Sequence, residues 1–338
     1  MTSDASVWRL VRSGFADGYE NMAVDEALML SIAEGKAPPT LRLYGWRPPG
    51  VSLGYFQAVE GQIDPDECKR RGYTVVRRPT GGRAILHDDE VTYSVAVRQA
   101  DLAEGERLIA SYREISRGIE AGLRRIGVGA AMANGSGQWS VVSGQQRKTA
   151  QAGGAPFDSA QGKLRLRPPT TNGKKRRGPV GDAPKPLWRR RESPPSSGGQ
   201  GRSGVPAACF AKAARSDMTV DGRKIVGSAQ ARRHGAILQH GSIPLRVNVE
   251  DVAAVMAPDS AGASALAAAA VSVSDAAGRG VTFEEMCEAL VAGFEEGLGV
   301  TLAEGELTDE ERELTVRLRE EKYGTDRWNL ERPGAQAR

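Results

Sequence analysis

The chain has 338 residues, 40% of them hydrophobic and 5% aromatic, which is enough to bury the core of one large domain or two ordinary ones. No apolar run is long enough for a transmembrane helix, and no apolar signal segment occurs, so the sequence predicts a cytoplasmic protein without a membrane partner. A net charge of +4 would favour nucleic acid only if the positive charge were spread over the fold, and it is not.

Short strands and three helices are predicted in the first part of the chain. Strands are expected at residues 7–11, 41–44, 51–57, 73–78, 84–86 and 91–98. Helices are expected at residues 21–34, 64–72 and 109–126. Asp25 and Glu26 are expected in the first turn of the helix at 21–34, where carboxylates are favourable against the helix dipole.

Positive charge is concentrated in the segment 134–205, which contains 14 Lys and Arg and three Asp and Glu, so the rest of the chain is net acidic. The segment is rich in Gly, Pro, Ser, Gln and Arg and cannot bury enough apolar surface to offset its conformational entropy. We predict that 134–205 is a disordered basic insertion in one catalytic domain formed by 1–133 and 206–338. The alternative is an arm that binds nucleic acid or a partner protein.

A hairpin and three further helices are predicted after this segment. The hairpin joins strands at 218–220 and 224–230 through Asp221 and Gly222, a pair typical of a type I′ turn. A strand at 236–245 follows, and helices are expected at 249–256, 282–298 and 308–323. The strands come as antiparallel neighbours, so the sequence predicts an α+β fold, with a mixed, largely antiparallel sheet flanked by helices.

A glycine loop is the first motif with chemical content. It lies in RRPTGGRAILHDDEVTYSV, residues 77–95. Paired glycines let a backbone approach a ligand closely and expose N–H groups that bind a carbonyl or an oxyanion. Taken alone, the loop is equally typical of a plain hairpin connection.

The second motif combines Cys209 with Lys224, fifteen residues later in DGRKIVGSAQ. A free thiol has a pKa near 8.5, and an ammonium within about 4–6 Å favours the thiolate and lowers that pKa. The alternatives are a cysteine that only fills the core and a lysine that is solvated on a strand. Cys68 and Cys287 lie in helical patterns and are expected to be structural. The three cysteines and three histidines show no metal-ligand spacing, so neither a metal nor a cofactor is expected.

Together these motifs resemble the biotin/lipoate protein ligase superfamily, over roughly residues 7–133 and 206–332. Arg83 replaces the third glycine usual in lipoate ligases, and the text around GSAQ and ILQHGSI is similar to the LipM-type octanoyltransferase branch. The resemblance implies that Cys209 forms an acyl-thioester and that Lys224 lies beside it. It also implies an acyl-binding set, namely Arg78, Thr80, Gly81, Gly82, His87, Gly227 and Ser228.

The function implied by the resemblance is transfer of octanoyl from octanoyl-acyl-carrier protein to the target lysine of a lipoyl domain, the first step of lipoyl cofactor biosynthesis. Acceptors would be the glycine cleavage H protein or E2 subunits. The alternatives are an ATP-dependent lipoate ligase, an amidotransferase between lipoyl-domain proteins, and a non-enzymatic nucleic-acid-binding paralogue. Basic clusters at 69–71 and 232–233 either receive acidic partner proteins or are ordinary solvated charges.

Overall fold

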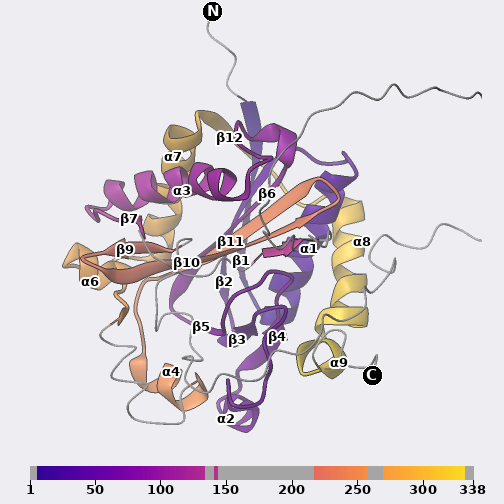
Figure 1. Ribbon diagram of the computed structural model, residues 1–338, viewed down its shortest axis with the longest axis vertical. Helices are drawn as coiled ribbons and strands as arrows, with labels where there is room; N and C mark the ends of the chain where they lie inside the picture. Colours follow the sequence, from indigo (N-terminus) through magenta and orange to yellow (C-terminus); the bar gives the residue numbers. More distant parts are fainter. Residues whose placement is uncertain (1–5, 134–140, 144–216, 257–268, 332–338) are drawn as a thin grey trace, which may run out of the picture.

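The computed structural model of the chain describes residues 6–133, 141–143, 217–256 and 269–331 (Figure 1). Within these residues the strands form one nine-stranded sheet and one three-stranded sheet. The large sheet has the order β12 (Val300–Glu304), β1 (Ser6–Ala16), β2 (Thr40–Trp46), β6 (Glu90–Arg98), β11 (Ala236–Pro244), β10 (Arg223–Arg233), β9 (Met218–Val220) and β7 (Ala131–Met132), with β8 (Val141–Ser143) beside β10. The small sheet has the order β4 (Thr74–Arg77), β3 (Gly50–Leu53) and β5 (Ile85–His87).

Helices lie on both faces of the large sheet, α1 on one and α3 with α7 on the other (Figure 1). The described helices are α1 (Gly18–Ala33), α2 (Pro65–Arg70), α3 (Leu108–Arg125), α4 (Val249–Met256), α6 (Val273–Ala277), α7 (Phe283–Leu298), α8 (Asp309–Leu318) and α9 (Asp326–Asn329). A π-helical segment, Arg319–Tyr323, follows α8, so the single helix predicted at 308–323 changes its hydrogen-bond pattern at its last turn. The α+β architecture with a mixed, largely antiparallel sheet is confirmed.

The two faces of the sheet follow the two-residue period of its strands. On β6, Tyr93 and Val95 pack in the core under α3 and α7, while Ala96 packs against α1. On β11, Ile237 faces the first core and Leu238 the second. Because successive side chains of a strand point to opposite faces, the central strands pack on both sides, and β11 and all of β6 except Arg98 are buried.

Helix α1 begins earlier than the sequence pattern indicated. Its N-cap is Asp17, whose carboxylate accepts a hydrogen bond from the Glu20 N–H. The prediction that Asp25 and Glu26 lie in the first turn is therefore wrong. Both carboxylates lie in the middle of the helix and are buried, Asp25 at 0% and Glu26 at 1% exposure. The helix crosses between the parallel strands β1 and β2, a connection that antiparallel hairpins do not provide.

The strands predicted at 41–44 and 51–57 belong to different sheets. Strand β2 pairs with β1 and β6, whereas β3 ends at Leu53 and pairs with β4 and β5. The hairpin predicted at Asp221 and Gly222 is confirmed, with φ of +49° and +77°, the two positive values that a type I′ turn requires.

Of the predicted insertion 134–205, the structure describes only β8, which pairs in parallel with β10. Ala133 and Asp217, the described residues on either side of this part of the chain, are neighbours, since the Ala133 N–H donates to the Asp217 carbonyl at 2.9 Å. The adjacent strands β7 and β9 pair antiparallel.

The contact between α3 and α7 depends on glycines, which supplies a stability prediction. A Cβ on Gly293 would lie 2.3 Å from the Gly122 nitrogen and 2.5 Å from the Gly118 carbonyl oxygen. Gly293→Ala should therefore push the helices apart and lower the free energy of unfolding by about 1–3 kcal/mol. The control is Gly280→Ala, whose Cβ would meet nothing closer than 4.0 Å. Urea unfolding of both variants checks this, and equal stabilities would contradict it.

Candidate active site

The glycine loop between β4 and β5 is held by Arg78. Its guanidinium donates to the Gly81 carbonyl at 2.8 Å, to the Arg83 carbonyl at 2.7 Å and to the Ser52 hydroxyl at 3.0 Å. Arg78 is only 3% exposed. The side chain therefore fixes the path of the loop backbone, instead of pointing into solvent as an anion-binding arginine would.

The loop also lies directly on the backbone that follows β3. The Tyr55 N–H donates to the Thr80 carbonyl at 2.8 Å, and a Cβ on Gly54 would lie 1.9 Å from the Gly82 carbonyl oxygen. Gly82 has φ of +101°, which favours glycine. A side chain at Gly54 would clash with the loop, and Gly82 has a backbone conformation that favours glycine. The contacts of the loop therefore determine its shape.

A buried chain of hydrogen bonds connects the loop to helix α1. The Thr80 hydroxyl lies 2.7 Å from Nε2 of His240, and Nδ1 of His240 lies 2.8 Å from the Asp25 carboxylate. An ionised carboxylate only accepts, so His240 donates from Nδ1 and accepts the Thr80 hydroxyl proton at Nε2. Burial lowers the pKa of His240 and outweighs the opposing effect of Asp25, which keeps the imidazole neutral.

Asp25 is the centre of this chain because it accepts from four side chains. Besides His240, it receives hydrogen bonds from Arg42 at 2.8 Å, Tyr44 at 2.9 Å and Ser94 at 2.8 Å. Burial alone would raise the pKa of Asp25, but the hydrogen bond from His240 and the charge of Arg42 lower it overall. The carboxylate therefore stays ionised at the centre of the fold.

His87 takes part in a second chain of the same kind. Its Nε2 lies 2.7 Å from the Ser52 hydroxyl and its Nδ1 lies 2.8 Å from Glu90, which also accepts from Ser242 at 2.5 Å. The imidazole stacks on Trp46 with ring centroids 3.9 Å apart. Since Ser52 also accepts from Arg78, this second chain runs from the glycine loop to strand β11.

Strand β10 carries the remaining predicted residues that the structure describes. The Lys224 ammonium is 2.9 Å from the Asp217 carboxylate, with side-chain exposures of 1% and 3%. The alternative of a solvated strand lysine is therefore wrong. Gly227 lies opposite Ser242 of β11, and the Ser228 hydroxyl lies 2.7 Å from the Tyr93 hydroxyl.

Two of the three cysteines lie in the described part of the chain, and both are buried. Cys68 and Cys287 are free thiols with 0% and 3% exposure. Burial raises the pKa of Cys68 to about 11 and that of Cys287 to about 12, so both are unreactive thiols, as expected. Cys209 lies outside the described residues, and its nucleophilic role stays a prediction.

The structure thus brings most of the predicted site residues into one connected group. Arg78, Gly81 and Gly82 meet in the loop, and the two histidine chains link the loop to α1 and β11. The sequence did not reveal four polar partners, namely Asp25, Ser52, Glu90 and Asp217. Only Asp25 gave a signal, as a carboxylate inside the apolar run NMAVDEALM, and we interpreted that signal as a helix-dipole effect.

The arginines of the two predicted basic docking clusters make contacts within the chain. Arg70 and Arg71 pair with Glu67, and Arg71 also pairs with Asp251. Arg233 pairs with Glu26 at 3.3 Å. Arg232 donates to the Gly105 carbonyl at 2.6 Å. These arginines serve internal contacts, which leaves less charge for an acidic partner.

Two general features concern ligands and membranes. Across the ranges that the structure describes, no three His, Cys, Asp or Glu side chains are grouped as metal ligands. No helix in those same ranges has both the length and the apolar character needed to span a bilayer.

The neutral state of His240 predicts a pH dependence of stability. The unfolded chain binds a proton on this residue near pH 6.5, whereas the folded chain, in which its pKa is lowered, does so only at lower pH. Stability should therefore fall as the pH drops below 6.5. In His240→Gln, urea unfolding at pH 7 and pH 5 should show a smaller fall than in the wild type. The exposed His234→Asn variant should keep the wild-type dependence, and an unchanged fall in His240→Gln would contradict a neutral imidazole.

The buried pair of Lys224 and Asp217 supplies another prediction. Asp217→Asn leaves the ammonium buried without its carboxylate, which should lower the free energy of unfolding by on the order of 3 kcal/mol. The acyl transfer implied by the resemblance should fall at least tenfold, a factor that corresponds to about 1.4 kcal/mol. The control, Asp221→Asn, changes an exposed turn residue with φ of +49°, which asparagine tolerates. Wild-type activity and stability in Asp217→Asn would refute this role.

Comparison with solved structures supports the fold. A bipartite lipoate protein ligase from Thermoplasma acidophilum, described with its E2 lipoyl domain, has a TM-score of 0.64 at 22% identity and covers 97% of each chain. A lipoate-protein ligase A bound with ATP has a TM-score of 0.63 at 22% identity, covering 98% of this chain and 100% of its own. At such identities the similarity concerns the fold alone.

Comparison with curated sequences defines the family. An octanoyltransferase LipM from Symbiobacterium thermophilum is 39% identical over 96% of this chain and 98% of its own. The octanoyltransferase LipM of Geobacillus kaustophilus is 37% identical over 96% and 99%. The profile of the lipoyl protein ligase A/B catalytic domain matches residues 17–151 and 199–295. With its glycine loop, buried lysine and these relatives, the chain belongs to the lipoyl protein ligase A/B catalytic domain family, within the octanoyltransferases of lipoate biosynthesis.

Proposed function

We propose that this acyltransferase takes octanoyl from octanoyl-acyl-carrier protein, carries it as a thioester on Cys209 and delivers it to the target lysine of a lipoyl domain. One observation supports the chemistry most directly: Lys224 is almost fully buried and paired with Asp217. A buried ammonium is costly, and breaking such a pair is strongly destabilising, so an unused lysine would be expected to lie in solvent.

The role of Lys224 follows from electrostatics. An ammonium beside Cys209 favours the thiolate over the thiol, and the thiolate is the nucleophile. Asp217 holds the ammonium in place within the buried site, at 2.9 Å. Lys224 therefore acts as a fixed positive charge toward sulfur, and Asp217 acts through Lys224.

The reaction has two steps that balance. The Cys209 thiolate attacks the donor thioester carbonyl, so one carbon–sulfur bond forms while another breaks, and the donor sulfur leaves as a thiolate. The amine of the acceptor lysine then attacks the acyl-enzyme carbonyl and forms an amide, while Cys209 leaves as a thiolate and the amine loses a proton. The first step exchanges one thioester for another, and the second is driven by amide formation.

The acyl-binding residues divide by their contacts. Arg78, Thr80 and His87 are buried and bonded within the chain, so in this proposal they shape the acyl site instead of contacting the chain directly. The glycines of the loop and Gly227 supply close backbone approach and N–H groups for the acyl carbonyl. Ser228, bonded to Tyr93, lies on the same strand.

Lipoyl domains are the proposed acceptors because the family is one of lipoyl protein ligases and a fold neighbour is described with its E2 lipoyl domain. The acyl-carrier donor follows from the thioester chemistry proposed for Cys209. The family profile leaves residues 152–198 unmatched, within the predicted insertion. We keep as a proposal that the predicted insertion 134–205 lies outside the catalytic domain apart from β8, which pairs with β10, and the cytoplasmic location stays a prediction.

The thioester predicts a covalent adduct. Wild-type protein mixed with octanoyl-acyl-carrier protein should gain one octanoyl mass, and hydroxylamine should remove it. Cys209→Ala should show neither adduct nor transfer to a lipoyl domain. Cys68→Ala and Cys287→Ala, which remove the unreactive buried thiols, should both keep the adduct. Lys224→Met should form the adduct at least tenfold more slowly, since less of Cys209 is thiolate.

The opposite results would be decisive. Octanoyl transfer by Cys209→Ala would exclude the thioester route. Turnover of free octanoate or lipoate that requires ATP and Mg²⁺ would instead assign the chain to the ligases.

A further inference from the structure

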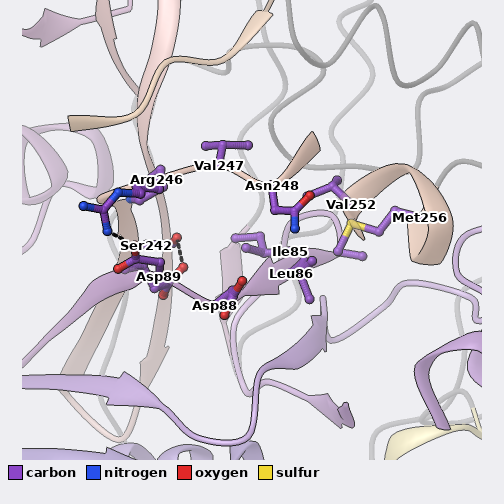
Figure 2. Close-up of a pocket in the computed structure, with 13 residues that line it drawn as sticks. Ile85, Leu86, Asp88, Asp89, Ser242, Arg246, Val247, Asn248, Val252 and Met256 are labelled. Carbon is purple, nitrogen blue, oxygen red and sulfur yellow. Dashed lines mark hydrogen bonds and ion pairs between the residues drawn. The ribbon is translucent and has the colours of Figure 1, made fainter. Parts of the chain in front are cut away.

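A pocket lies beside the β5–β6 turn. Its walls come from this turn, from the end of β11 with the segment after it, and from α4 (Figure 2). None of the predicted acyl-binding residues lines it. The pocket is therefore distinct from the predicted acyl-binding residues.

The walls of the pocket are mainly apolar. Figure 2 shows Ile85 and Leu86 on one side and Val252 and Met256 beside them, with Val247 above. Met256 and Ile85 are 1% and 7% exposed, so these side chains are firmly packed. Such walls fit a short aliphatic chain.

The polar part of the pocket is negatively charged. Asp88, Asp89 and Glu90 line it, with Arg246 as the one basic lining residue. Arg246 forms an ion pair with Asp89, at 2.8 Å. Glu90 is 3% exposed and accepts hydrogen bonds from His87 and from the hydroxyls of Thr92 and Ser242.

Asp88 is the carboxylate that lacks a partner. Throughout the described part of the chain, its side chain makes no hydrogen bond or ion pair. Burial raises its pKa, as do the nearby carboxylates of Asp251, Asp89 and Glu90. A carboxylate half-buried among like charges gains most from a ligand that brings a positive charge.

Apolar walls together with unneutralised carboxylates restrict the class of ligand that fits the pocket. An anion would meet three carboxylates, and a hard metal ion would need several oxygen ligands instead of aliphatic walls. An alkyl ammonium satisfies both parts, with methylenes along Leu86 and Val252 and the charge at Asp88.

We propose that this pocket binds the side chain of the acceptor lysine, with its ammonium at Asp88 and its methylenes along the apolar wall. The proposal rests on the proposed function, in which a protein lysine is the second substrate. The pocket adjoins the candidate active site, because Ser242 lines the pocket and lies opposite Gly227 of β10. Asp88 would thus select a lysine in its protonated form; the ammonium then gives its proton to Asp88, and the neutral amine moves on to attack the acyl-enzyme carbonyl.

The test separates the two half-reactions of the full-length protein. Adduct formation is measured with octanoyl-acyl-carrier protein alone, and decay of the preformed adduct is measured against increasing lipoyl domain. In Asp88→Asn, adduct formation should stay within twofold of the wild type. The lipoyl-domain concentration needed for half-maximal decay should rise roughly tenfold or more, because loss of a hydrogen bond between charged groups weakens binding by about that factor.

The matched control is Glu250→Gln, which removes one exposed carboxylate near the pocket, at the start of α4. An equal rise in this control would mean general attraction between the proteins and would overturn the proposal. An Asp88→Asn variant that is slowed equally in adduct formation would overturn it too, since the pocket would then serve the donor. Unchanged acceptor dependence in Asp88→Asn would do the same.

A binding measurement keeps the inference independent of catalysis. N-acetyl-lysine methylamide and its uncharged norleucine analogue are titrated into the wild type and Asp88→Asn and followed by NMR. The lysine compound should bind the wild type at least tenfold more tightly than the norleucine compound, and Asp88→Asn should lose this preference. Equal binding of the two compounds would refute the lysine pocket, even if Cys209 forms no adduct and the proposed function fails.

Discussion

The buried carboxylate of Asp25 is the contact on which the site geometry depends. It joins helix α1 to β2 through Arg42, to β6 through Ser94 and to β11 through His240. An unpaired charge at this depth would cost several kcal/mol, so the four donors and the carboxylate require one another. Any shift of α1 across the sheet would break several of these bonds at once, and the register between helix and sheet is fixed accordingly.

The two histidine chains transmit this register to the glycine loop. In each chain a carboxylate accepts a hydrogen bond from Nδ1 of a histidine, and Nε2 of the same ring bonds to a hydroxyl in or next to the glycine loop. His240 reaches Thr80, and His87 reaches Ser52, which also receives Arg78. The loop glycines are free to approach a ligand because the neighbouring side chains, and not the glycines themselves, determine where the backbone lies.

Sequence patterns predicted the features that interactions between residues close in the chain determine. The turn at Asp221 and Gly222 needs two positive φ values, which this pair supplies locally, and it was correctly predicted. The burial of Asp25 was missed because its partners Arg42 and His240 lie 17 and 215 residues away. The first turn of α1 was also missed, although Asp17 and Glu20 have the spacing of a helix cap. Lys224 was assigned from family resemblance, and its carboxylate partner became visible only in three dimensions.

The hydrogen bond between Ala133 and Asp217 has an evolutionary consequence. The hydrogen-bonded residues Ala133 and Asp217 lie at adjacent points of the fold, so the chain between them begins and ends at neighbouring positions. Doubling the length of a flexible loop costs only about 0.6 kcal/mol of closure entropy, so this position tolerates large insertions and deletions. The point of return is nevertheless Asp217, the partner of Lys224. Chain length between Ala133 and Asp217 can therefore vary, but selection on the buried ion pair should keep Asp217 in place.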